Sequence, residues 1–126
     1  PEGGSIKHDV SVPVSSIPAF MAEADAAVAT MIPGGRICAF GHLGDGNIHF
    51  NVIQGPHGVA ADLVNRVVHD SVARFDGSIA AEHGIGQYRI AELARLKPAS
   101  ELALMQRIKQ ALDPHGLLNP GKVLPT

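Results

Sequence analysis

The sequence predicts an α+β domain with a ferredoxin-like antiparallel sheet, its two main helices on one face, and further helices at the C-terminus. Three observations support this prediction. The chain has 126 residues and is 45% hydrophobic, which is enough for one domain with a core. Segments with strand-like and helical patterns follow one another in the order strand, helix, strand, strand, helix, strand. Two more helical segments come after them.

Each element is predicted from a local pattern. The expected strands cover residues 5–12, 36–43, 47–53 and 78–81. The expected helices cover residues 17–31, 59–75, 88–96 and 100–112. Pro13 ends the first strand, and Ser16 and Ser100 are suitable N-caps for the first and last helices. In the last helix, the side chains expected to point inward are Leu102, Met105, Ile108 and Leu112.

The segment 40-FGHLGDGNIHFNV-52 is expected to be a β-hairpin that turns at Asp45-Gly46, because this dipeptide is favoured where both central residues need positive φ. This register places His42 directly opposite His49, with Cβ atoms about 4.5–5.5 Å apart. The apolar face, expected to pack under the helices, contains Ile37, Ala39, Gly41, Leu43, Ile48, Phe50 and Val52. His42, His49 and Asn51 then lie on the other face, which no helix of this chain is expected to cover.

The spacing of the two histidines leaves two interpretations open. Two imidazoles at this separation can bind one metal ion between them. Cross-strand histidines are also often solvated, or bonded to carbonyl groups, and a lone pair is a weak signature. The second motif, 82-EHGIG-86, favours chemistry, because Glu82 would complete a His2Glu set with open positions for substrate. Taken alone, that motif is also typical of an exposed turn. The other histidines are interpreted as surface or packing residues: His8, His57, His69 and His115.

Composition narrows the class of function. The formal net charge is −2 and no Lys/Arg cluster is present, so nucleic acid is not an expected partner. No apolar run reaches the roughly 20 residues of a membrane span, and the first residues lack a signal-peptide pattern. The single cysteine, Cys38, excludes an internal disulfide and favours a reducing, cytoplasmic compartment. The sequence does not begin with Met, so we expect a piece of a longer protein, and a homodimer is among the expected assemblies.

Four segments carry a resemblance to a known family: KHDVSVP, GHLGDGNIHFNV, EHGIG and NPGKVLP, in this order. Together they resemble the C-terminal domain of FAD-linked oxidases, the flavin group that includes D-lactate dehydrogenases, D-2-hydroxyglutarate dehydrogenases and the glycolate oxidase D subunit. The resemblance spans residues 7–125. It implies that residues 1–126 form one substrate-side domain, which covers FAD bound elsewhere and holds a D-2-hydroxy acid for oxidation to a 2-oxo acid by hydride transfer.

The resemblance also implies roles for residues of the two histidine motifs. The metal ligands of metal-dependent members match His42, His49 and Glu82, and their catalytic base matches His83. Zinc suits imidazole and carboxylate ligands, while manganese, cobalt and iron fit as well.

Three further positions match residues that contact substrate or cofactor. Asn51 matches a substrate-contacting position, and Lys7 matches a position that helps to bind the substrate carboxylate. Asn119 matches a position near the flavin, and Glu82 is expected beside the cofactor as well as on the metal.

The chain also departs from the family pattern. An FAD-binding domain is not among these 126 residues, and the family's arginine for the substrate carboxylate would lie upstream of Lys7. We therefore expect the chain alone to be inactive and to need an FAD-binding domain as its partner. Two alternatives stay open. One is a non-catalytic metal-binding or regulatory module derived from the same fold. The other is a metal-dependent hydrolase, since His2Glu sites also activate water.

Overall fold

The structure, a computed structural model, describes residues 4–125. The chain divides between His83 and Gly84 into two compact units. We call them unit 1, which ends at His83, and unit 2, which begins at Gly84, and describe each by itself. None of the helices among the described residues combines the length and apolar character that crossing a membrane requires.

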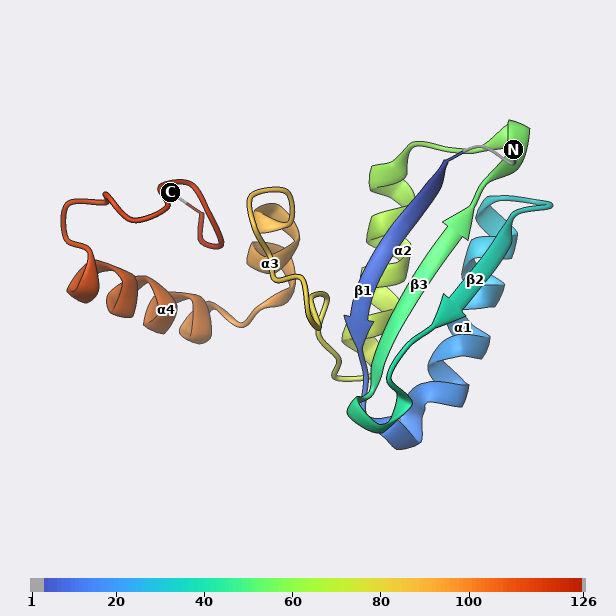
Figure 1. Ribbon diagram of the computed structural model, residues 1–126, viewed down its shortest axis with the longest axis horizontal. Coiled ribbons are helices and arrows are strands. Elements are labelled where there is room, and N and C mark those ends of the chain that lie inside the picture. The colour runs from blue at the N-terminus through green and yellow to red at the C-terminus, as the bar shows by residue number, and fades with distance from the viewer. Residues whose placement is uncertain (1–3, 126) are drawn as a thin grey trace. The chain divides into compact units, whose positions relative to one another are not determined.

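Unit 1 contains a three-stranded antiparallel sheet in the order β1-β3-β2 (Figure 1). The strands are β1 (Ser5–Ser11), β2 (Arg36–Phe40) and β3 (Asn47–Ile53). The central strand, β3, pairs with β1 on one edge and with β2 on the other. The predicted α+β class with an antiparallel sheet is thus confirmed.

Helices α1 (Ile17–Met31) and α2 (Ala61–Arg74) lie on the same face of this sheet (Figure 1). Helix α1 buries Phe20, Ala24 and Val28, which recur every four residues and so form one stripe along the helix. Phe20 meets Phe50 of β3 edge to face, with ring centroids 5.9 Å apart. Burying one such side chain contributes about 1.5–3 kcal/mol, so this row holds α1 against the sheet.

The hairpin differs in register from the prediction. Residues Leu43–Asp45 form a short 3-10 turn, η2, instead of two strand ends around a dipeptide turn. Strand β2 therefore stops at Phe40, and Phe40, not His42, pairs with His49. The amide N–H groups of Asp45 and Asn47 both turn back to the carbonyl of His42, at 3.0 and 3.2 Å. These bonds hold the backbone of the turn out of the ladder.

The change in register is two residues, so the side chains that stay within β2 and β3 keep their predicted faces. Phe50 and Val52 are buried under the helices, while Cys38 and His49 belong to the face that α1 and α2 leave open. We call this the open face. The expected burial fails for three residues of the apolar set, because Ala39 on the edge strand, Gly41 after it and Leu43 in the turn are all exposed.

The expected strand over residues 78–81 is reduced to an isolated bridge between Ser78 and Ser11. The backbone of Ser78 exchanges two hydrogen bonds with Ser11, at 2.8 and 2.9 Å, and the N–H of Ala81 donates to the carbonyl of Asp9 at 3.1 Å. The segment therefore runs along the outer edge of β1 without a regular ladder. It brings the next residues of the chain, Glu82 and His83, to Asp9.

The histidines outside the two motifs behave as packing or surface residues. His8 and His69 are buried, and the ring of His8 bonds to the carbonyl of Phe50 and to the side chain of Asn65. His115 is exposed. The side chain of His57 lies outside the described part of the chain.

Unit 2 contains helices α3 (Ile90–Leu96) and α4 (Ala99–Leu112). The last helix begins directly after Pro98, so Ser100 lies inside it and does not cap it. The inward-facing set predicted for α4 is wrong in its second half, because Ile108 and Leu112 are 51% and 77% exposed.

Candidate functional site

Five polar side chains from four segments of unit 1 gather near one end of the sheet. Asp9 lies on β1 directly opposite His49 on β3. His42 immediately precedes the η2 turn. Glu82 and His83 follow the segment that runs along β1. These residues lie far apart in the sequence, and the pairing of the strands brings them close together.

Glu82 lies between the two histidines of the hairpin motif. Its Oε1 atom is 3.5 Å from Nδ1 of His42, and its Oε2 atom is 3.5 Å from Nε2 of His49. His49 is mostly buried, whereas the side chains of His42 and Glu82 are 73% and 46% exposed. The predicted cross-strand pairing of the histidines is absent, yet the carboxylate brings both of them into one cluster.

Each of these two distances fits a pair of ligand atoms on a divalent cation, and the two contacts use different oxygens of Glu82. A separation of 3.5 Å is too long for a strong hydrogen bond. Ligand atoms bound at 2.0–2.2 Å to a tetrahedral cation lie roughly 3.3–3.6 Å apart, which matches both contacts of Glu82. Among the described residues, one group of three has a ligand atom from each residue within 4.8 Å of the others, and it consists of Asp9, His49 and Glu82. His42 is outside this group and reaches it through the other oxygen of Glu82.

Asp9 is the most buried member of the cluster, with its side chain 2% exposed. Its Oδ2 atom accepts hydrogen bonds from the backbone N–H groups of Glu82, at 2.8 Å, and His83, at 2.7 Å. Burial raises the pKa of the Asp9 carboxyl, but these backbone bonds and the imidazoles of His83 and His49 outweigh burial, so the pKa lies below its ordinary value. The carboxylate is therefore charged at neutral pH.

His83 lies at the exposed rim of the cluster. Its Nδ1 atom is 3.7 Å from Oδ2 of Asp9, and its side chain is 66% exposed. The ring of His49 lies beside it, with centroids 5.7 Å apart, and the ring of Phe40 lies 5.1 Å from that of His49. An imidazole backed by a carboxylate and open to solvent on its other side can accept a proton from a bound molecule.

The predicted substrate-contacting residues belong to the next row of the same sheet. Lys7 on β1 pairs directly with Asn51 on β3, and Asn51 pairs with Cys38 on β2. Directly opposed residues share a face, so Lys7 and Asn51 lie on the open face, one row from Asp9 and His49. Lys7 is exposed and Asn51 is half-buried.

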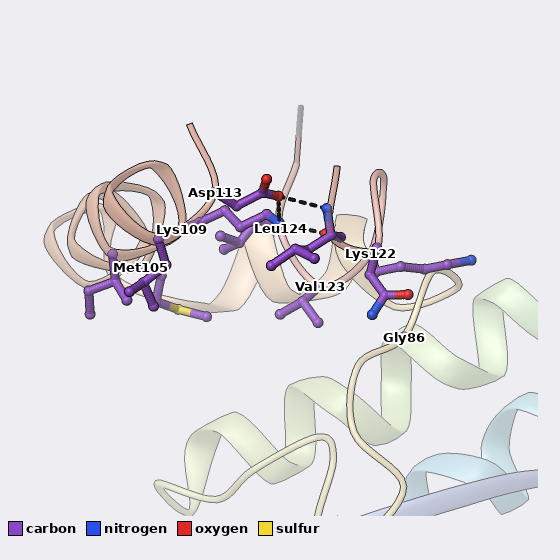
Figure 2. A pocket seen from close by; sticks show the side chains of 11 residues that line it. Gly86, Met105, Lys109, Asp113, Lys122, Val123 and Leu124 are labelled. Carbon is purple, nitrogen blue, oxygen red and sulfur yellow. Dashed lines mark hydrogen bonds and ion pairs between the residues drawn. The ribbon is translucent and has the colours of Figure 1, made fainter. Parts of the chain in front are cut away.

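Asn119, the predicted flavin-side residue, belongs to unit 2. There it lines a pocket of about 660 Å³, together with apolar side chains of α4 and the C-terminal segment (Figure 2). Lys109 donates to Asp113 and to the carbonyl of Leu118 at this pocket. The structure thus groups His42, His49, Glu82 and His83, while Asn119 lies in the other unit.

The sequence analysis overlooked Asp9, although it lies inside the segment KHDVSVP. Aspartate is disfavoured in strands. An aspartate inside the predicted strand was therefore a signal that its carboxylate has a specific partner.

Comparison with known proteins places these observations in a family. Residues 1–123 match the family model of FAD linked oxidases, C-terminal domain. The chain is 46% identical over 126 residues to a D-2-hydroxyglutarate dehydrogenase of Xanthomonas citri pv. viticola, an alignment that covers 95% of this chain and 27% of that protein. It is 39% identical over 124 residues to a protein of the same name from Stutzerimonas stutzeri, covering 93% and 26%.

A more distant relative is the D-2-hydroxyglutarate–pyruvate transhydrogenase of Saccharomyces cerevisiae, 35% identical over 97% of this chain and 26% of that protein. The chain thus spans about a quarter of the length of these curated relatives.

Proposed function

Since this chain belongs to the family of FAD-linked oxidase C-terminal domains, we propose that it forms the substrate side of a flavin-dependent 2-hydroxy-acid dehydrogenase. The reaction is oxidation of a D-2-hydroxy acid to the 2-oxo acid with metal assistance. D-2-hydroxyglutarate is the first substrate to test, because two bacterial relatives bear its name. A partner domain supplies most of the FAD site.

One observation carries the proposal. The carboxylate of Glu82 contacts the imidazoles of both His42 and His49, and the next residue, His83, offers a second kind of chemistry at the same place. A metal-ligand set and a proton acceptor side by side suit a reaction that must both polarise a hydroxyl group and remove its proton.

In this proposal, His42, His49 and Glu82 hold a divalent cation, with zinc the best fit to their donor atoms. When bound, the cation acts as a Lewis acid that lowers the pKa of the substrate hydroxyl, and FAD accepts the hydride from C2.

The side chains of the open face do the remaining work. Lys7 pairs with the substrate carboxylate, and the amide of Asn51 hydrogen-bonds to the substrate and fixes its orientation. His83 takes the hydroxyl proton at Nε2, because its Nδ1 faces Asp9. As this proton leaves, the C2–H electron pair departs as hydride and the C–O bond becomes a carbonyl.

The test uses the flavoprotein in which this chain is joined to its FAD-binding domain. His83→Ala should lower kcat by about 10²–10⁴-fold, the usual contribution of a general base, while bound metal stays near the wild-type amount. His42→Ala should lose both turnover and metal. A matched control is His115→Ala, which removes an exposed imidazole in unit 2 and should change neither quantity.

Full kcat in the His83→Ala variant would refute the assignment of the base. Metal binding without any oxidation of 2-hydroxy acids, in a protein that contains FAD, would instead favour a non-catalytic metal-binding module. A cytoplasmic location and a homodimer remain predictions from the sequence, to be tested by fractionation and by light scattering.

A further inference from the structure

We propose that Asp9 is a positioning residue that orients the metal ligand His49, the base His83 and the backbone that carries Glu82, all through one buried carboxylate. The inference rests on the proposed function for the roles of these three residues. It goes beyond that function because Asp9 itself need touch neither substrate nor metal.

Asp9 holds the backbone of the segment that carries Glu82. The N–H groups of Glu82 and His83 both donate to Oδ2 of Asp9. A side chain of β1 thus accepts the hydrogen bonds that backbone carbonyls of a neighbouring strand would accept in a regular ladder. The regular hydrogen bonding to β1 ends at Ala81. Without the carboxylate, two amides beside the cluster lose their acceptor, and the turn that presents Glu82 is released.

The other carboxylate oxygen of Asp9 faces the ring of His49. Oδ1 of Asp9 is buried and has no hydrogen-bond partner among the described residues. A buried charged oxygen without a partner is costly. Nδ1 of His49 faces it at 3.8 Å, beyond hydrogen-bond length, and a movement of about 1 Å would close a charge-assisted bond of about 2.8 Å.

The orientation of the His49 ring shows how the contact with Asp9 bears on metal binding. Nδ1 faces Asp9 and Nε2 faces Glu82, so the ring lies between a buried carboxylate and the proposed metal position. A proton on Nδ1 leaves the lone pair on Nε2 free for a metal ion, and metal-bound histidines generally donate their other N–H to such a partner. Asp9 therefore selects the tautomer of His49 that can bind metal.

The same carboxylate acts on the proposed base. Nδ1 of His83 lies 3.7 Å from Oδ2 of Asp9, which favours a proton on that nitrogen as well. Nε2 of His83 then keeps the lone pair needed to accept the substrate proton, the arrangement in which an aspartate behind a histidine supports base catalysis.

Substitution of Asp9 by Asn tests the tautomer directly, because it keeps the shape and changes one oxygen to a donor. The amide oxygen must stay with the N–H groups of Glu82 and His83. Its NH₂ group then faces Nδ1 of His49, which has to become an acceptor. The ring proton moves to Nε2, the atom that faces Glu82, and metal binding must displace it.

The measurements are zinc affinity by chelator competition and the ¹⁵N shifts of the His49 ring at about pH 8, above the ordinary histidine pKa of about 6.5. We expect the wild type to carry the His49 proton on Nδ1 and the Asp9→Asn variant to carry it on Nε2. Zinc affinity should fall by about 10–100-fold in the variant, the usual cost of losing such a partner.

A matched control is Asp113→Asn in unit 2. Asp113 is also buried and also accepts two backbone N–H bonds, from Leu117 and Leu118, so its substitution imposes a similar local loss. It should leave both the zinc affinity and the His49 shifts unchanged.

Three results would test the positioning role of Asp9 or the metal site. A wild-type His49 protonated on Nε2 overturns the proposal without any variant, which covers the case that Asp9→Asn fails to fold. An unchanged tautomer and zinc affinity in a folded Asp9→Asn protein overturn it too. A wild type that binds no zinc, yet shows the expected tautomer and its change in the variant, refutes the metal part of the proposed function while Asp9 keeps its positioning role.

Discussion

Replacing Gly46 by Ala should be one of the most damaging single-methyl changes in the hairpin. Gly46 ends the η2 turn with φ of +71°, a left-handed conformation that costs an L-residue about 1–2 kcal/mol. A Cβ atom there would lie 2.1 Å from the carbonyl oxygen of Val12, where real contacts stay above 3.0 Å. The backbone must therefore move.

That movement would weaken a hydrogen bond between β1 and the turn. The N–H of Val12 donates to the carbonyl of Gly46 at 3.0 Å and ties the turn to the end of β1. Such a bond contributes about 0.5–1.5 kcal/mol. Adding the backbone strain, we expect Gly46→Ala to lower the free energy of unfolding by about 1.5–3.5 kcal/mol.

Two other glycines of unit 1 distinguish the cost of backbone strain from the cost of the steric clash. Gly44 lies in the same turn, with ordinary φ and open space around its Cβ position, so Gly44→Ala should be close to neutral. Gly34 has φ of +81° and nothing within 4 Å of a Cβ atom, so Gly34→Ala should cost only the backbone strain, about 1–2 kcal/mol.

The assay is urea unfolding of the three variants and the wild type, followed by circular dichroism, with equal m-values as the check that only stability changed. The order of destabilisation should be Gly46, then Gly34, then Gly44. If Gly46→Ala costs no more than Gly34→Ala, the close approach of β1 to the turn is not as described and the reasoning fails.

Three further predictions concern the core, the surface and pH. Phe50→Ala should cost about 3–5 kcal/mol in urea unfolding, because Phe50 is fully buried, and a loss below 1 kcal/mol would contradict that placement. Glu23→Gln breaks an exposed ion pair with Arg74 and should cost at most about 1 kcal/mol, an effect that added salt removes; a larger, salt-independent loss would show a different role. The hydrogen bond from Lys109 and backbone N–H groups lower the pKa of Asp113 to about 2. This folded-state pKa is lower than the unfolded value of 3.8. The Tm of the wild type should therefore exceed that of Asp113→Asn by its full amount above pH 3.8, and the difference should vanish as the pH falls through about 2. A Tm difference that does not change with pH would exclude this linkage.

The sequence patterns predicted the sheet and its two main helices well, because periodicity there is strong. The helix Ile17–Met31 and the strand Asn47–Ile53 have the predicted bounds. The assignment of side chains to faces also held for the residues that stay within the strands. Because the error in the hairpin register was an even number of residues, His49 and Asn51 kept their places on the open face.

Other features depended on contacts that local patterns do not contain. The dipeptide Asp45-Gly46 is typical of a two-residue turn, yet hydrogen bonds back to the carbonyl of His42 closed a longer one. The amides that bond to Asp9 lie far along the chain, so no residue near Asp9 in the sequence indicates this contact. The apolar spacing of α4 indicated a buried stripe, but the spacing does not say whether a partner is there, and Leu112 is exposed among the described residues.

Asp9 meets amides that follow it by 73 and 74 positions in the sequence. No local segment can hold these atoms together, because closing so long a loop has an entropy cost that only the finished sheet offsets. We therefore expect assembly of the cluster to be a late step in folding. A partly folded form that keeps its helices but has released β1 would have lost the geometry of the cluster. If the cluster binds zinc as proposed, zinc affinity would report whether folding is complete, which helix content does not.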